Sequence, residues 1–241
     1  MKITFINHSS FLAELEHTAF LFDYYEGEIP AIAESKKLYV FASHHHGDHF
    51  SPAIFNLAAK HPNIHFVLSN DIFPSNVPEA LQAKTTYLRP RMTWNSAEHA
   101  GHEQLPSDIT VSTLKSTDEG VAFLIQCEGK TIYHAGDLNW WRWEGEPDYW
   151  NQQMEENFKE FIEPLRGVSI DIGFIPLDSR QEHDYKLGLN YYLTLTNTKT
   201  IFPMHCWGDY TIIDRWITDH PDSPYKDRII KITKQGASFS L

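Results

Sequence analysis

The run HHHGDH at residues 44–49 holds the densest set of chemically active side chains in this sequence. It reads as His-x-His-x-Asp-His, and alternation along an extended segment places His44 and His46 on the same side. A following bend lets Asp48 and His49 turn back toward a neighbouring point. Imidazole and carboxylate groups bind zinc, manganese or iron, and ligands this close suit two ions about 3.5–4 Å apart. The run therefore predicts a binuclear metal site rather than a solvated polar loop.

Two later positions fit the same site. A predicted strand over residues 131–134 is followed by Gly136 and Asp137, which puts a carboxylate at the mouth of that strand. A predicted strand over residues 200–204 is followed directly by His205. Either residue alone is more often a cap or a turn residue than a metal ligand. Together with the histidine run, they complete a set of ligands.

Short apolar runs separated by turns predict the strands and helices that must position these residues. Runs typical of strands lie at residues 11–15, 19–23, 38–42, 65–68, 109–114, 121–127, 131–134, 170–176 and 200–204. Runs typical of helices lie at residues 54–60 after Ser51 and Pro52, and at 152–165, 185–195 and 212–218. Residues 70–107 have weak periodicity and predict irregular strands and loops. Strand-rich halves that each finish with helices predict an α+β fold, with two packed sheets and helices outside.

Length and composition bound the class of protein. A chain of 241 residues that is 41% hydrophobic excludes collagen and disorder, and we expect one domain over residues 1–241. The net charge of −12 repels phosphate backbones and anionic lipids, so neither nucleic acid nor membrane is an expected partner. The opening residues are not typical of a signal peptide, and no apolar run approaches the ~20 residues of a spanning helix. We therefore expect a cytoplasmic protein.

These motifs resemble those of the metallo-β-lactamase-fold hydrolases. The resemblance rests on the run at residues 44–49, on Asp137 after its glycine, and on His205. The opening residues 7–11 and 21–23 also resemble the start of the branch that contains ascorbate-phosphate lactonase. The resemblance implies a metallo-β-lactamase-like four-layer αββα sandwich, with a binuclear site at one edge between the sheets.

The resemblance also implies roles for residues around the second metal. Asp48, His49 and His205 would hold that ion, and Asp48 would be the catalytic residue that orients the bridging water or transfers a proton. Asp23 would hydrogen-bond a ligand imidazole and fix its tautomer, which such sites commonly need.

The first metal departs from the family pattern. His44 and His46 would hold it and Asp137 would bridge the two ions, but the stretch 114–120 lacks the third histidine that the family usually supplies. Asp118 is one replacement, and an oxygen ligand would shift the preference from zinc toward manganese or iron. A site with two imidazoles, the bridge and solvent is another, and a decayed site with one remaining metal is a third. We favour two divalent metals with an altered first site, zinc being the first choice.

Three further residues are candidates for substrate contacts. His8 follows the first strand, where the resembling branch approaches the site, and it is a candidate either to support a metal ligand or to contact substrate. Arg142 belongs to the tryptophan-rich run 140–143, which predicts either a hydrophobic wall over the metals or a surface cluster such as a homo-oligomer interface. Arg180 follows a strand at the expected ligand end and would clamp an anionic group, unless it only pairs with Asp178 in a turn.

The ligand set and the resemblance together predict a metal-dependent hydrolase. A metal-bridged hydroxide would attack an ester, lactone, amide or phosphoester of a small anionic metabolite. Because the first site lacks its histidine, the alternative is a metal-binding or ligand-sensing protein of the same fold without turnover.

Overall fold

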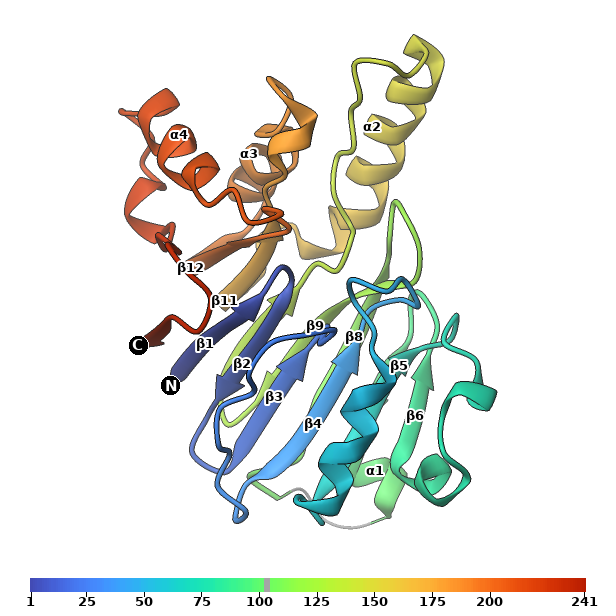
Figure 1. Cartoon of the computed structure of the whole chain (residues 1–241). Coiled ribbons are helices and arrows are strands. Elements are labelled where there is room, and N and C mark those ends of the chain that lie inside the picture. The colour runs from blue at the N-terminus through green and yellow to red at the C-terminus, as the bar shows by residue number, and fades with distance from the viewer. Residues whose placement is uncertain (102–104) are drawn as a thin grey trace.

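The computed structural model describes residues 1–101 and 105–241 and contains two mixed sheets (Figure 1). The first sheet has the strand order β13-β1-β2-β3-β4-β5-β6. Its strands are β1 (Lys2–Asn7), β2 (Ser10–Glu14), β3 (Thr18–Phe22), β4 (Lys37–Ala42), β5 (Ile64–Ser69), β6 (Thr85–Leu88) and β13 (Ser238–Ser240). Strands β3 to β6 are parallel to one another, whereas β13, β1, β2 and β3 pair in antiparallel fashion.

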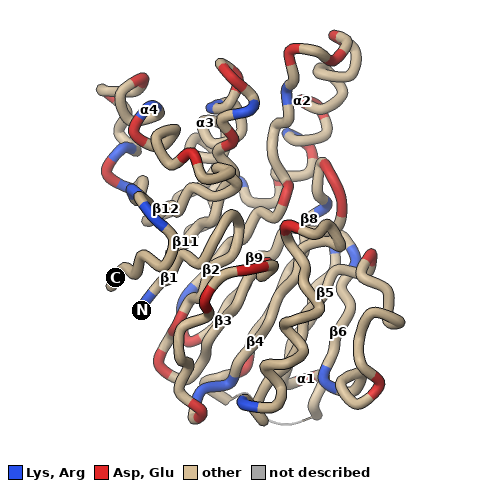
Figure 2. Tube along the Cα trace, viewed as in Figure 1, with Lys and Arg blue, Asp and Glu red and all other residues tan. Residues whose placement is uncertain are grey.

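The second sheet has the strand order β12-β11-β10-β9-β8-β7. Its strands are β7 (Thr93–Asn95), β8 (Thr110–Lys115), β9 (Val121–Cys127), β10 (Lys130–His134), β11 (Ser169–Pro176) and β12 (Asn197–Met204). Strands β10 to β12 are parallel, and the other pairs are antiparallel. Strands β3, β5 and β9 contain no Lys, Arg, Asp or Glu, which suits strands buried between layers (Figure 2).

Aromatic side chains fill the space between the two sheets. The ring of Phe11 on β2 lies 4.4 Å from that of Phe174 on β11, and Phe22 lies 5.5 Å from the same ring. Phe41 on β4 meets Phe123 on β9 at 5.0 Å between ring centroids. These rings are fully buried, and each contributes about 1.5–3 kcal/mol relative to an exposed one. The two sheets therefore pack face to face, and their aromatic side chains form the central core.

Helices cover the outer faces of the sandwich. The 3-10 helix η1 (Pro52–Ala59) packs Ile54 and Phe55 into the same apolar cluster as Val40 of the first sheet. On the other side, Tyr192 of α3 stacks on Tyr133 of β10 at 5.6 Å. The α-helices are α1 (Ser96–Ala100), α2 (Asp148–Ile162), α3 (Leu187–Leu195) and α4 (Thr211–Asp219). The short 3-10 helices are η2 (Pro74–Asn76), η3 (Glu79–Lys84), η4 (Glu163–Leu165), η5 (Ser179–Gln181) and η6 (Lys226–Arg228). The predicted α+β sandwich with outer helices is confirmed.

Two local predictions need correction. The helix after Ser51 is present, with the Ser51 hydroxyl accepting from Ala53 N at 3.3 Å, but it is a 3-10 helix. The segment 70–107 was expected to hold irregular strands and loops, and its described part holds the short strands β6 and β7, but also the short helices η2, η3 and α1. These helices are three to six residues long, too short for an apolar period to show in the sequence. Within the described residues, no helix is long and apolar enough to cross a membrane.

The strands that carry the chemically active residues end at one edge of the sandwich. Strand β1 pairs with β2 and β2 with β3 in antiparallel fashion, so β1 and β3 end on the same side as their parallel neighbour β4. In the second sheet, β10, β11 and β12 end together for the same reason. The residues that follow these strand ends are His8, Asp23, His44, Asp137, Asp178 and His205.

The two sheets are in close contact at this edge around Gly120. Val121 N donates a hydrogen bond to Ser43 O at 2.9 Å, which ties β9 to the end of β4. A Cβ on Gly120 would lie 2.0 Å from Ser43 O and 2.7 Å from the Cβ of His44, and its φ is +66°. Both the close approach and the positive φ exclude a side chain at this position.

We therefore expect Gly120→Ala to lower the free energy of unfolding by about 2–4 kcal/mol, through backbone strain and a clash that displaces His44. Urea denaturation followed by circular dichroism measures this change. Gly145→Ala is the matched control, because nothing lies within 4 Å of a Cβ there. Equal stability of the two variants would contradict this account of the sheet contact.

Candidate metal centre

Four predicted residues form a first group of ligand atoms. His44, His46, Asp118 and Asp137 each offer one atom, and these atoms lie within 4.8 Å of one another. His44 Nε2 is 3.6 Å from Asp137 Oδ2, and His46 Nδ1 is 3.7 Å from Asp118 Oδ2. His44 and Asp137 are buried, whereas Asp118 is exposed. The structure thus brings Asp118 to the group that lacks the expected third histidine.

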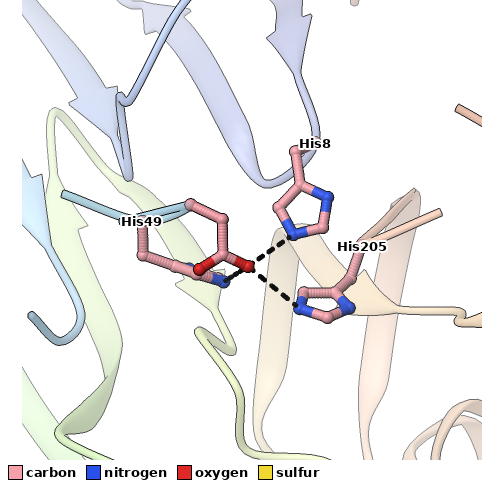
Figure 3. A group of neighbouring side chains, drawn as sticks. His8, His49 and His205 are labelled. Carbon is pink, nitrogen blue, oxygen red and sulfur yellow. Dashed lines mark ion pairs between the residues drawn. The ribbon is translucent and has the colours of Figure 1, made fainter. Parts of the chain in front are cut away.

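A second group lies beside the first and contains His8, Asp48, His49 and His205. Asp48 Oδ2 lies 3.3 Å from His8 Nε2, 3.7 Å from His49 Nε2 and 4.0 Å from His205 Nε2. Figure 3 shows the three imidazoles converging on one point from separate segments of the chain. The expected trio of Asp48, His49 and His205 lies together, and His8, the candidate for ligand support or substrate contact, joins it.

Asp137 stands between the two groups. Its Oδ2 faces His44 Nε2, while its Oδ1 lies 3.2 Å from His49 Nε2 and 3.5 Å from His205 Nε2. A carboxylate with one oxygen toward each group is placed as a bridging ligand would be.

The hydrogen bonds of these histidines leave their Nε2 atoms free. His49 Nδ1 donates to Asp23 Oδ2 at 2.7 Å, and His205 Nδ1 donates to Asp178 Oδ2 at 3.0 Å. The Ser43 hydroxyl donates to Asp23 at 2.6 Å, so it accepts from His44 Nδ1 at 3.0 Å. Each neutral ring then directs the lone pair of Nε2 into the site, as a metal ligand requires.

Several of these atoms have no hydrogen-bond partner although they are buried. Among the described residues, they include His8 Nε2, His44 Nε2, His49 Nε2 and Asp137 Oδ1. A buried polar atom without a partner costs about 1–3 kcal/mol, so four at one point call for a common partner. Imidazole nitrogens and carboxylate oxygens are the ligands of zinc, manganese and iron, and the residues present therefore fit a divalent metal.

The carboxylates create a field that favours positive charge. Burial would lower the pKa of His49, but Asp137, Asp23 and Asp48 outweigh it and raise this pKa to about 9. At His44, burial dominates over the attraction of Asp137 and lowers the pKa to about 4. Asp137, Asp23 and Asp48 together therefore favour positive charge at the position of the His49 ring.

Asp23 supports both the histidine run and the edge of the first sheet. It is fully buried and follows β3, and it accepts from Ser43 N at 2.7 Å as well as from the Ser43 hydroxyl and His49. Burial would raise the pKa of Asp23, but His134 and His49 outweigh it and lower this pKa to about 2. This contact with a ligand imidazole is the one expected from the sequence.

Asp178 is a supporting residue that the sequence analysis assigned only to a turn. Its carboxylate accepts from His205 Nδ1 and from the guanidinium of Arg180, whose Nε lies 2.9 Å from Asp178 Oδ1. A signal existed in the sequence, because Asp178 and His205 each follow a predicted strand. Only the parallel pairing of β11 with β12 shows that these strand ends are neighbours.

The two arginines predicted to contact substrate are both paired. Arg142 Nε donates to Asp184 Oδ2 at 3.1 Å. Arg180 lines a cavity beside Asp118, Asp137 and His205, but its charge is balanced by Asp178. Neither guanidinium is therefore an uncompensated anion site, because each already binds a carboxylate.

This edge of a two-sheet sandwich, with its paired histidine and carboxylate groups, has the architecture of a metallo-hydrolase. Residues 2–142 match the family model described as the beta-lactamase superfamily domain, and the chain belongs to this family. The chain is 30% identical to a UPF0173 metal-dependent hydrolase of Opitutus terrae over 153 residues, which are 57% of this chain and 63% of that protein. It thus spans less than two thirds of that relative.

Two further comparisons extend over most of the chain. A UPF0173 metal-dependent hydrolase of Carboxydothermus hydrogenoformans is 27% identical over 214 residues, which cover 85% of this chain and 84% of that protein. The solved structure of Igni18, a metallo hydrolase from Ignicoccus hospitalis, superimposes with a TM-score of 0.59 at 15% identity, covering 100% of this chain and 98% of that one. The structural likeness shows the shared fold.

Replacement of Asp23 by Asn tests the supporting contact. We expect Asp23→Asn to lower the free energy of unfolding by about 3 kcal/mol, because the buried hydrogen bonds lose their charged acceptor. Loss of this partner should also weaken metal binding ~10–100-fold. Calorimetric titration with zinc and thermal unfolding measure the two effects. Asp214→Asn, at an exposed ion pair with Lys231, should change neither, and unchanged metal affinity in Asp23→Asn would refute the positioning role.

Proposed function

We propose that this protein is a metal-dependent hydrolase that cleaves an ester, lactone, amide or phosphoester of a small metabolite. The observation that carries the proposal is the pair of adjacent ligand groups that share Asp137, with buried ligand atoms that lack any other partner. The names of the UPF0173 relatives support the same class of reaction. Lactones are the first bonds to test, because the opening residues resemble the ascorbate-phosphate lactonase branch.

We assign the first metal to His44, His46 and Asp118, and the second to a set in which His8 joins Asp48, His49 and His205. Asp137, with one oxygen toward each set, would bridge the two ions. Bound divalent cations lower the pKa of water toward neutrality and polarise the bond to be cleaved. With Asp137 counted in both, the first set offers two nitrogens and two oxygens, whereas the second offers three nitrogens and two oxygens. The first should therefore accept manganese or iron more readily, and the second should prefer zinc.

Asp48 is the residue best placed to handle protons. Its side chain is 26% exposed, so it reaches water from an otherwise buried group. Burial would raise the pKa of Asp48, but the neighbouring imidazoles of His8 and His49 outweigh it and hold this pKa below its usual range. An ionised carboxylate at this position can orient a water molecule and accept its proton.

The first test is metal content together with chelation. Protein purified without chelator should contain two divalent ions per chain by elemental analysis. Hydrolysis of its best substrate from a panel of lactones and phosphoesters should disappear on chelation and return when metal is added. His46→Ala should lose activity by at least ~100-fold, the scale of losing a key electrostatic group. His17→Ala, at an exposed histidine, is the control.

Metal binding without hydrolysis would favour the alternative function. Metal binding that raises the melting temperature, with no turnover of any substrate in the panel, would support the ligand-sensing protein and refute the hydrolase. Activity that survives both chelation and His46→Ala would refute the metal-dependent mechanism.

Single-site variants test the assignment of Asp118 and His8. We expect Asp118→Ala to lose about one metal equivalent per chain and to retain the other, since the two sets share only Asp137. His8→Ala should lower the affinity for the second ion by at least ~10–100-fold, the cost of losing a residue that supports a metal ligand. Calorimetric titration of metal-free protein with zinc and manganese separates the two events. Two unchanged equivalents in either variant would remove that residue from the ligand set.

A further inference from the structure

A cavity of about 160 Å³ opens directly beside the metal-binding residues. Asp118, Asp137 and His205 line one side of it. The remaining wall consists largely of apolar side chains, and we call this part the aromatic pocket, formed by Trp141, Trp143, Trp150 and Met154. A group bound in the pocket would therefore lie next to the atoms at which we propose that hydrolysis takes place.

The tryptophans are held rigidly in place. Trp141 is buried, and its Nε1 donates to the backbone carbonyl of Asp137 at 2.9 Å. The ring of Trp141 lies 5.3 Å from that of His205, and Trp143 stacks on it at 5.8 Å with an interplanar angle of 4°. Trp150 belongs to helix α2 and contributes to the same wall. Flat, fixed rings of this kind bind a planar apolar group with little loss of side-chain entropy.

The charge at the pocket does not select for an anion. Arg180 is the cation that lines it, but its guanidinium is held by Asp178 and lies over the rings of Trp143 and Trp207, at 5.7 and 4.6 Å. Asp178 in turn holds His205. Arg180 therefore acts as a part of the wall and supports the position of a ligand histidine, rather than presenting a free positive charge to substrate.

From this geometry we propose that the substrate carries a single planar ring next to the bond that is cleaved, as in an ester of an aromatic carboxylic acid. The volume sets the size, because an apolar protein cavity of about 150 Å³ holds one benzene molecule. The proposal rests on the hydrolase function. In the reaction, the oxygen of one water molecule bonds to the acyl carbon, the acyl C–O bond breaks, and an alcohol and a carboxylic acid leave.

The test uses benzoate and acetate as ligands of the metal-loaded protein. Both carry the same carboxylate, so any difference in affinity reports on the ring. Calorimetry, with tryptophan fluorescence as a second signal, should give a Kd for benzoate at least tenfold lower than for acetate. Cyclohexanecarboxylate, which is not planar, should bind more weakly than benzoate. Equal affinity for benzoate and acetate would overturn the proposal, and an aliphatic ring that binds as well as benzoate would overturn the planar requirement.

Two variants localise the effect to the pocket. Trp143→Ala should remove most of the preference for benzoate and leave acetate binding unchanged. Met154→Trp should do the same by filling the cavity, which keeps the test decisive if Trp143→Ala folds poorly. Tyr149→Ala is the control, because Tyr149 is 76% exposed. A full preference retained in both pocket variants would overturn the proposal.

The readout separates this proposal from the proposed function. Because binding needs no turnover, a clear preference for benzoate without hydrolysis of any ester would support the pocket and refute the hydrolase. Metal-dependent hydrolysis with no difference between the two carboxylates would support the hydrolase and refute the pocket.

Discussion

The buried carboxylate of Asp23 is the interaction on which the metal centre depends. It accepts hydrogen bonds from the backbone and the hydroxyl of Ser43 and from the ring of His49. Through Ser43 it also sets the tautomer of His44, so one carboxylate orients a histidine of each ligand group. A charge that is fully buried is tolerated only when such donors surround it, and this is why the histidine run has a single arrangement.

Three residues of the metal centre have a strained backbone that the sheets hold in place. His8, Asp23 and His205 adopt positive φ values of 51°, 42° and 62°, which side chains with a Cβ rarely do. Each costs about 1–3 kcal/mol and persists only where the surrounding structure determines it. All three lie directly after a strand of the sandwich, so the sheets hold the turns that aim these side chains. The stability of the aromatic core between the sheets therefore supports the geometry of the site.

The two ligand groups differ in more than their donors. The second group is largely buried and rich in imidazole, whereas the first is open to solvent through Asp118, and residues of both groups line the cavity of the aromatic pocket. The solvent-open group is thus the one whose ligand set departs from the family pattern. Trp141 connects the metal-binding residues with the aromatic pocket, because its Nε1 donates a hydrogen bond to the backbone carbonyl of Asp137 and its ring forms part of the pocket wall.

The sequence by itself determined the motif, most of the strands and helices, and the sandwich class. His44, His46, Asp48, His49, Asp137 and His205 stood out because each lies in the dense run or directly follows an apolar strand, and the structure gathers them at one edge. Local patterns carry that information, since strand periodicity and strand ends are visible in single segments. The pairing of Arg180 with Asp178, two residues away, was already an alternative in the sequence. The tertiary structure alone decided the places of His8 and Asp178. Their partners, Asp48 and His205, lie 27 or more residues away, and contacts between distant strand ends leave no local trace.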